Sequence, residues 1–319
     1  MKPMVFVTRR IPESGMDLLR SHCTLHVHEH DRQITKEELL LGVANADGLL
    51  CLLSDPVDVE VIQAGSRLRC ISNYAVGYNN IDVEAARAAG IMVTNTPGVL
   101  TEATADIAFA LMLACARRIV ESDTWLREGK FRGWEPMLFL GHDLQGATLG
   151  IIGAGRIGQA LARKAVGAYG MRLLYHNRKR DASFEQQLGA QYSDLDTVLR
   201  EADVLSLHLP LTPDTRHLIG ERELGLMKRS AILINTARGP VVDEQALIRA
   251  LREERIFAAG LDVYEEEPSI PDELIALRNT VLLPHIGSAS VRTRQRMAEI
   301  AARNLIAVLD GREPEFRVV

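Results

Sequence analysis

The chain lacks the features that mark membrane, secreted and nucleic-acid-binding proteins. Its longest helical apolar run, IAFALMLACA, has ten residues, about half of what a membrane span requires. The formal net charge of -5 argues against a protein that coats nucleic acid or anionic membrane, because both require a basic surface. The opening MKPMVFVTRR reaches arginine after a short apolar run, so it predicts a first strand rather than a signal peptide, and we expect a cytoplasmic protein.

Cysteine is sparse, and no two cysteines form a C-x-x-C pair. The four thiols lie far apart, at Cys23, Cys51, Cys70 and Cys115. Such spacing is typical of reduced core thiols in a cytosolic protein and argues against structural zinc.

One histidine-rich segment, HCTLHVHEH, raises the question of another kind of metal site. His26, His28 and His30 would share one face if the segment is a strand, and an exposed face of that kind can bind a metal. A polar strand edge near the surface is the commoner explanation. We therefore expect no bound metal.

Length and strand pattern predict two α/β domains. At 319 residues the chain exceeds the size at which single cores usually stop growing, and its 47% hydrophobic and 25% charged residues are those of an ordinary globular protein. Short β-branched runs alternate with helical patterns in two series, the first from MVFVT to LRCISN and the second from TLGII to TVLLPH. This alternation predicts parallel sheets covered on both faces.

Several helices are predicted from periodicity and capping. The first series should contain helices near residues 13–20, 57–64 and 83–89, and Thr35 with Glu38 forms a capping box. TEATADIAFALMLACARRIVESD predicts one long helix that connects the two series. SVRTRQRMAEIAARNLIAVLDG predicts a last helix ending at Gly311, which could pack back on the first domain and make that domain discontinuous.

A glycine fingerprint predicts a dinucleotide site. Gly153, Gly155 and Gly158 form G-x-G-x-x-G between the apolar strand TLGII and a helical run. The bare motif is weak evidence, but this context is specific, because the glycines allow a tight turn and the helix amino terminus meets a pyrophosphate. A glycine turn without a ligand is the alternative.

The next strand, MRLLYHN, ends without the acid that would bind both ribose hydroxyls of NAD. Asn177 can hydrogen-bond a ribose oxygen, and the cations that follow it are Arg178, Lys179 and Arg180. Two charge-assisted hydrogen bonds to a 2′-phosphate, each about 1.5–3 kcal/mol, would favour NADPH by roughly a hundredfold or more. A solvated basic turn is the alternative.

Three residues after strand ends of the second series form a coherent catalytic set. Arg238 follows AILINT, Glu267 lies just beyond AAGLDVY, and His285 ends TVLLPH, where open α/β sheets place ligands. Hydride delivery to a ketone needs a proton donor, a role that suits His285. A carboxylate at Glu267 would fix the imidazole, and the Arg238 guanidinium could hold a substrate carboxylate. Each residue alone also has an ordinary structural explanation.

The chain resembles the D-isomer-specific 2-hydroxyacid dehydrogenase family over almost its whole length. The resemblance lies within the glyoxylate/hydroxypyruvate reductase branch, which includes the bacterial 2-ketogluconate reductases. It is carried by NTARGPVVDE, AAGLDVYEEEP, PHIGSAS, VGYNNIDVEAA, TEATAD, TLGIIGAGRIGQ and LPLTPDTRHLI.

The resemblance implies roles for particular residues. Arg238, Glu267 and His285 match the family's catalytic residues. The substrate would be bound by Arg238 and His285 together with Leu52, Leu53, Ser54, Val76 and Gly77, the last two through backbone amides. The cofactor-binding set would be Thr104, Gly153, Gly155, Arg156, Ile157, Gly158, Asn177, Arg178, Lys179, Asp262 and Gly287. Asp262 and Gly287 would lie at the nicotinamide amide, and Arg156 and Ile157 at the pyrophosphate.

The resemblance also implies an architecture of two Rossmann-like, doubly wound parallel-sheet domains. A discontinuous, flavodoxin-like substrate domain would comprise residues 1–99 and 287–319, and an NAD(P)-binding domain would comprise residues 100–286. Members of the family are usually homodimers through the cofactor domain. One departure concerns the substrate pocket: the branch often has an aromatic residue before the FLG of this region, where this chain has Leu138, although Trp134 is nearby.

Together these observations predict a reductase of small 2-oxo acids that prefers NADP(H) and can use NAD(H). An NAD-dependent D-2-hydroxyacid dehydrogenase and a phosphite dehydrogenase are the alternatives in the same fold. Phosphoglycerate dehydrogenase is disfavoured because the sequence ends at Val319 without a regulatory domain, and formate dehydrogenase because Glu267 is an acid. A dinucleotide-sensing corepressor is the alternative from another class, but the chain shows no long disordered tail.

Overall fold

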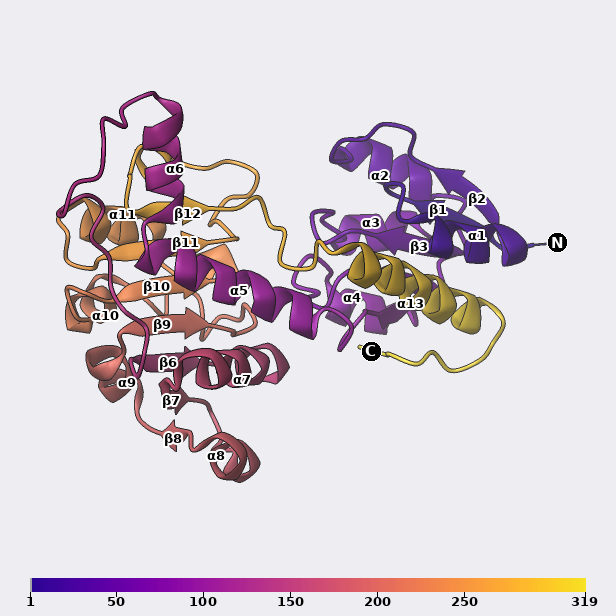
Figure 1. Ribbon diagram of the computed structural model, residues 1–319. Helices are drawn as coiled ribbons and strands as arrows, with labels where there is room; N and C mark the ends of the chain where they lie inside the picture. Colours follow the sequence, from indigo (N-terminus) through magenta and orange to yellow (C-terminus); the bar gives the residue numbers. More distant parts are fainter. Residues whose placement is uncertain (1) are drawn as a thin grey trace. The chain divides into compact units, whose positions relative to one another are not determined.

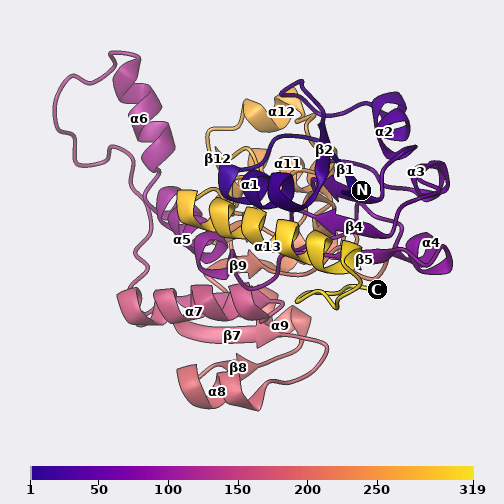
Figure 2. The same cartoon turned by 90° about the vertical axis from the view of Figure 1, so that its right-hand side faces the viewer.

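The computed structural model describes residues 2–319. The chain divides into two compact units, of which the first comprises Met1–Leu100 and Ser288–Val319 and the second Thr101–Gly287. Each unit is built around one parallel sheet (Figures 1 and 2). The prediction of two Rossmann-like α/β folds is confirmed.

The first unit has a five-stranded sheet in the order β2-β1-β3-β4-β5, with every pair of neighbours parallel. Its strands are β1 (Met4–Val7), β2 (Thr24–Val27), β3 (Gly48–Cys51), β4 (Cys70–Asn73) and β5 (Met92–Thr94). Its helices are α1 (Glu13–His22), α2 (Lys36–Val43), α3 (Val59–Ala64), α4 (Val83–Ala88) and α13 (Val291–Leu309). The strand order is that of flavodoxin-like sheets.

Two local predictions in this unit are confirmed. Thr35 and Glu38 form the capping box at the start of α2. The last helix, α13, packs against α1 and β4 of the first unit, as Figure 1 shows. The approach to α1 is close, because a Cβ placed on Gly15 would lie 2.7 Å from the carbonyl oxygen of Ala298.

The second unit has a seven-stranded parallel sheet in the order β12-β11-β10-β9-β6-β7-β8. Its strands are β6 (Thr148–Ile152), β7 (Arg172–His176), β8 (Gln191–Tyr192), β9 (Val204–Leu207), β10 (Ile232–Asn235), β11 (Ala258–Leu261) and β12 (Thr280–Leu282). The order reverses between β6 and β9, and ligands of open α/β sheets bind at such a reversal. The inner strands are buried along their whole length, as expected for a sheet covered on both faces.

The second unit has α-helices between its strands, most of which lie on the two faces of the sheet. They are α5 (Thr101–Ala116), α6 (Ile119–Arg127), α7 (Arg156–Tyr169), α8 (Ala182–Leu188), α9 (Leu195–Glu201), α10 (Glu221–Leu226), α11 (Glu244–Arg252) and α12 (Asp272–Ile275), with a short 3-10 turn at Gly239–Val241. Figure 2 shows α6 and the loop after it projecting from the rest of this unit.

The prediction of one long connecting helix is wrong. The segment is divided into α5 and α6 by Arg118, whose φ of 52° is left-handed. The segment after α6 comes back to the end of α5, where the backbone N–H of His142 donates to the carbonyl oxygen of Ala116 at 2.9 Å. The helical pattern continues through the break, so the pattern alone does not reveal the tertiary contact that ends α5.

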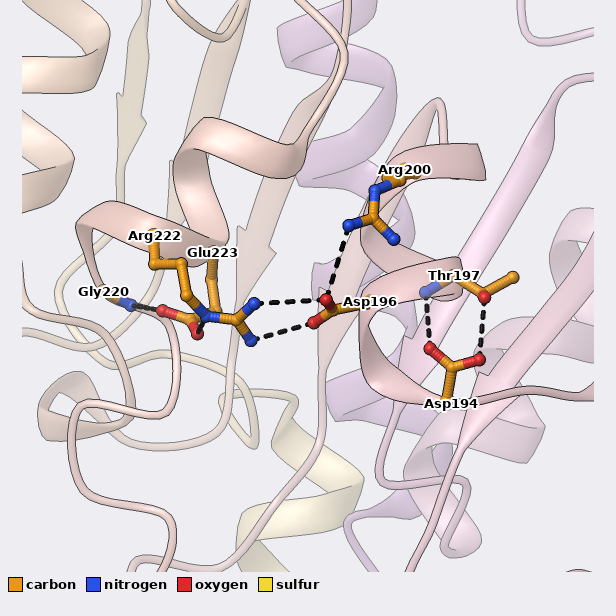
Figure 3. A network of polar contacts seen from close by, with 7 residues as sticks. All are labelled: Asp194, Asp196, Thr197, Arg200, Gly220, Arg222 and Glu223. Carbon is orange, nitrogen blue, oxygen red and sulfur yellow. Dashed lines mark hydrogen bonds and ion pairs between the residues drawn. The ribbon is translucent and has the colours of Figure 1, made fainter.

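A polar network on the surface of the second unit joins α9 to α10 (Figure 3). Arg222 donates to both carboxylate oxygens of Asp196, at 2.8 and 3.1 Å, and Arg200 reaches the same carboxylate. The hydrogen bonds from Arg222 lower the pKa of Asp196. The groups are exposed and screened by solvent, so we assign the network a structural role.

Candidate active site

The glycine turn after β6 has the geometry of a phosphate-binding loop. Gly153 has a left-handed φ of 91°, and a Cβ there would lie 2.8 Å from the backbone of His208. A Cβ on Gly158 would lie 2.8 Å from the carbonyl oxygen of Gly153. By contrast, a Cβ on Gly155 would have no protein atom within 4 Å. Folding of the described chain therefore requires the first and third glycines, whereas the second leaves open space where a pyrophosphate could approach the backbone.

The helix that follows this turn suits an anion. Within residues 2–319, no side chain caps the amino terminus of α7, which begins at Arg156. The first N–H groups of a helix have no partner inside the helix, and they favour negative charge. The residues of this turn therefore fit a dinucleotide pyrophosphate.

In the basic turn after β7, one cation is paired with a carboxylate and two are not. Asn177 is held against the glycine turn, because its Oδ1 accepts the backbone N–H of Ala154 at 2.8 Å. Arg180 donates twice to Glu185, both times at 2.7 Å. Arg178 and Lys179 are exposed and have no hydrogen-bond or ion-pair partner within residues 2–319. Two of the three predicted cations are thus available for a phosphate.

His285 and Glu267 form the central pair of the site. The His285 Nδ1 lies 2.7 Å from Glu267 Oε2, and Glu267 Oε1 accepts the backbone N–H of Tyr264 at 3.1 Å. Burial acts to raise the pKa of the Glu267 carboxyl, but the hydrogen bond and charge of His285 outweigh burial, and the pKa lies below its usual value. An ionised Glu267 accepts a hydrogen bond from the N–H at His285 Nδ1, which leaves Nε2 as the nitrogen for chemistry. His285 also has a left-handed φ of 54°, a strained conformation of the kind found at functional sites.

Arg238 follows β10 in a turn that buried side chains define. Asn235 Nδ2 donates to the carbonyl oxygen of Arg238 at 3.0 Å, and Asn235 Oδ1 accepts the N–H of Ala237 at 3.0 Å. Burial lowers the pKa of Arg238, while the charge of Glu267 opposes this shift. The charges of Arg238 and Glu267 therefore favour each other, since Arg238 also acts to lower the pKa of Glu267. The role of Asn235 was not predicted, because its only signal in the sequence is a polar residue at the end of a buried strand.

Gly239, next to Arg238, is a close-packing position. A Cβ there would lie 1.8 Å from the carbonyl oxygen of Tyr264 and 2.5 Å from the backbone nitrogen of Glu265. The loops that carry Arg238 and Glu267 are therefore in direct backbone contact. Only glycine fits at this point.

Asp262, Gly287 and Thr104 also lie together. The buried carboxylate of Asp262 accepts the N–H groups of Ile286 and Gly287, each at 2.7 Å. A Cβ on Gly287 would lie 3.1 Å from Asp262 Oδ2 and 3.3 Å from Thr104 Cγ2. Burial raises the pKa of Asp262, and these backbone hydrogen bonds oppose the shift. Asp262 thus anchors the chain immediately after His285.

In the first unit, the loops expected to bind substrate are held by two asparagine side chains, of which Asn73 is buried and Asn95 is half-buried. Asn73 Nδ2 donates to the carbonyl oxygen of Gly77 at 2.7 Å, and Asn95 Nδ2 donates to that of Val76 at 2.8 Å. Among residues 2–319, the backbone N–H groups of Val76 and Gly77 donate to no protein acceptor. These amides are therefore available for an anion. The roles of these two asparagines were not predicted from the sequence.

The loop Leu52–Ser54 is fixed in a similar way. The buried Asp55 accepts the N–H of Leu52 at 2.7 Å and the hydroxyl of Thr8 at 2.5 Å. Asn80 Nδ2 donates to the carbonyl oxygen of Leu52 at 3.0 Å. Burial raises the pKa of Asp55, and its hydrogen bonds oppose that shift.

Two further structural facts concern metals and membranes. Within residues 2–319, no three His, Cys, Asp or Glu side chains are grouped as metal ligands would be. His28 Nε2 lies 3.3 Å from the carboxylate of Glu38. No helix in the described part of the chain has the length and apolar character needed to cross a membrane.

Comparison with known proteins gives the family. Residues 109–287 match the family described as D-isomer specific 2-hydroxyacid dehydrogenase, NAD binding domain. Glyoxylate reductase of Thermococcus gammatolerans is 53% identical over 318 residues, which cover 98% of this chain and 95% of that protein. The chain belongs to the D-isomer-specific 2-hydroxyacid dehydrogenase family.

Solved structures of other proteins agree in fold. A protein of Thermus thermophilus is 50% identical, with a TM-score of 0.92 and coverage of 99% of this chain and 100% of that one. An NADPH-dependent glyoxylate/hydroxypyruvate reductase of Sinorhizobium meliloti, solved with NADP and malonate, is 33% identical. Its TM-score is 0.88, with coverage of 100% of this chain and 97% of that one. This 2-hydroxyacid dehydrogenase chain therefore has the family fold over its whole described length.

The glycine turn gives a test of the dinucleotide site. We expect Gly155→Val to weaken binding of NADPH and NADH strongly, because its side chain would occupy the open space, while the thermal unfolding midpoint stays near that of the wild type. Gly158→Val is the matched control, and it should lower the midpoint because its side chain would meet the backbone of Gly153. Fluorescence titration and calorimetry measure the two effects. Unchanged cofactor binding in a folded Gly155→Val protein would contradict the assignment.

Proposed function

We propose that the protein reduces small 2-oxo acids, among them glyoxylate, hydroxypyruvate and 2-ketogluconate, to D-2-hydroxy acids, with NADPH as the preferred cofactor and NADH as a possible one. The observation that carries the proposal is the 2.7 Å contact between His285 Nδ1 and Glu267, with the loop of Arg238 in backbone contact with the loop of Glu267. The 50% to 53% identity to glyoxylate reductases over nearly the whole chain supports the substrate class.

The chemistry requires one proton donor and a means of holding a carboxylate. A dihydronicotinamide dinucleotide held at the glycine turn would supply the hydride when bound. His285 Nε2 gives its proton to the carbonyl oxygen as negative charge develops there, and Glu267 stabilises the imidazolium and holds its orientation. Arg238 pairs with the substrate carboxylate and polarises the neighbouring carbonyl. In the oxidative direction, His285 accepts the proton instead.

The first unit supplies further groups for the substrate carboxylate. We assign this role to the unpaired N–H groups of Val76 and Gly77, whose carbonyl oxygens are fixed by Asn95 and Asn73. Leu52, Leu53 and Ser54 would line the same pocket. In this scheme the first unit adds backbone donors for the substrate, and the second unit carries the cofactor-binding and catalytic side chains.

The basic turn supports the proposed preference for NADPH. Arg178 and Lys179 can both donate to a 2′-phosphate, because neither is engaged within residues 2–319. Asp181, the first acid after the turn, is already used as the N-cap of α8, where it accepts the N–H of Phe184. It is therefore not available to bind the ribose hydroxyls as the acid of an NAD site does.

We also propose a homodimer through the second unit. Residues 119–140, which comprise α6 and the loop after it, expose an unusual number of large apolar side chains. These are Ile119, Val120, Leu126, Phe131, Trp134, Met137 and Leu140. Two cavities of about 570 and 300 Å³ lie beside α6, and both are lined by Val120 and Glu121. A second copy of the chain would cover this surface.

The reaction is tested by kinetics with His285→Ala. We expect turnover of glyoxylate, hydroxypyruvate or 2-ketogluconate with NADPH in the wild type, and a loss of kcat of at least about 100-fold in the variant. Cofactor binding, measured by fluorescence titration, should be nearly unchanged. No turnover of any of these acids by the wild type, or full activity of the variant, would overturn the proposal.

The cofactor preference is tested by changing the basic turn. In the double variant Asn177→Asp with Arg178→Ile, the ratio of kcat/KM for NADPH to that for NADH should fall by roughly 100-fold. Arg180→Ile is the matched control, because Arg180 is paired with Glu185 and should leave the ratio unchanged. Equal effects of the two changes would mean that the turn acts only through its total charge.

The dimer is tested by placing charge on the exposed apolar loop. The wild type should sediment with the mass of two chains, and Trp134→Glu with Met137→Glu should give the mass of one, because both side chains are largely exposed and would be buried between copies. Leu41→Glu, at an equally exposed position in α2 of the first unit, should remain dimeric. A monomeric wild type would refute the dimer.

A further inference from the structure

Three consecutive glutamates near the site have different surroundings. Glu267 pairs with His285. The side chain of Glu266 is exposed and has no partner within residues 2–319. Glu265 is mostly buried, with 19% of its side chain exposed, and it is contacted from two other segments of the second unit. In the sequence the three form a single acidic run, so only the structure shows that their surroundings differ.

The carboxylate of Glu265 accepts hydrogen bonds from the loop before α10. The His217 ring nitrogen Nε2 lies 2.6 Å from Glu265 Oε1, and Arg216 Nη2 lies 3.4 Å from the same oxygen. His217 has a left-handed φ of 51°, which a residue with a side chain adopts only when its surroundings hold it. The contact with Glu265 is one of the interactions that holds it.

A second pair of contacts joins Glu265 to the start of α11. The backbone N–H of Glu265 donates to Glu244 Oε2 at 3.3 Å, and the backbone N–H of Glu244 donates to Glu265 Oε2 at 3.4 Å. Each residue thus gives its backbone donor to the other's carboxylate. This reciprocal arrangement fixes both the backbone and the side chain of Glu265.

These contacts surround the loops that carry the catalytic pair. The backbone of Tyr264 and Glu265 lies directly against Gly239, the residue after Arg238. The N–H of His217 donates to the carbonyl oxygen of Pro240 at 2.8 Å. Tyr264, on the other side of Glu265, gives its N–H to Glu267. Glu265 therefore lies where three loops meet, namely those that carry Arg238, Glu267 and His217.

We propose that Glu265 is a positioning residue, which acts through the 264–267 loop to keep the Glu267 carboxylate on His285 Nδ1. The inference rests on the proposed function, in which that hydrogen bond orients the proton donor. Glu265 itself touches neither reacting group. It sets the geometry of the loop from which Glu267 reaches His285, and small errors in such geometry are costly to the chemical step.

The experiment compares the same substitution at the three adjacent positions. Glu265→Gln, Glu266→Gln and Glu267→Gln are assayed for kcat, for the dissociation constant of NADPH and for the thermal midpoint. We expect Glu265→Gln to lower kcat about tenfold or more, with unchanged NADPH affinity, and Glu266→Gln to behave as the wild type. A purely structural role for Glu265 would lower the midpoint without this separation of kcat from cofactor affinity.

A double variant shows whether Glu265 acts through Glu267. If it does, Glu265→Gln should cost little further activity once Glu267→Gln is present, so the two losses should not multiply. His217→Asn removes the contact from the other side while keeping a residue that tolerates left-handed backbone, and it should lower kcat in the same manner. Multiplying losses would overturn the proposal.

The outcomes also separate this inference from the proposed function. Full activity in Glu267→Gln would refute the role of the Glu267–His285 pair itself. A large loss in Glu267→Gln combined with wild-type kcat in Glu265→Gln would leave that role intact and refute the positioning role of Glu265.

Discussion

All strands of the second unit run in one direction, and this constraint gathers the candidate catalytic and cofactor-binding groups at one edge of one sheet. The glycine turn follows β6, the basic turn follows β7, and Arg238 follows β10. Glu267 and His285 lie beyond β11 and β12. The parallel pairing of strands therefore brings residues that are far apart in sequence to the same edge of the sheet. The remaining problem is to fix the loops, because a strand end alone does not determine where a side chain points.

In both units, buried polar side chains fix these loops through hydrogen bonds to the loop backbone. Asn73 and Asp55 in the first unit, and Asn235 and Asp262 in the second, each bind backbone groups of a loop that follows a strand. A buried polar group left unpaired is costly, so each such side chain holds its loop to one arrangement. In the first unit this leaves the N–H group of Val76 pointing to no protein acceptor within the described chain. The side-chain hydrogen bonds that stabilise a loop thus also leave its backbone N–H groups available to a ligand.

The sequence was sufficient for features that depend on local pattern. Strands, most helices and the capping box of Thr35 follow from periodicity and short-range hydrogen bonding, and the resemblance pointed to Arg238, Glu267 and His285. The break after Ala116 could not be predicted, because it coincides with a contact from His142, which is distant in sequence. Nor could the pattern show that Asn235 shapes the Arg238 turn. Both depend on contacts between residues distant in sequence, which a single sequence does not display.

Runs of like charge show most clearly why composition does not determine function. In the basic turn, the cation of Arg180 is satisfied by Glu185, whereas Arg178 has no partner in the described chain and can meet a ligand. In the acidic run, Glu265 and Glu267 are chemically identical but are bound by different loops. A charged side chain on a surface contributes little by itself, since solvent screens it. Its role is set by whether a neighbour already holds it, and that neighbour is supplied by the fold.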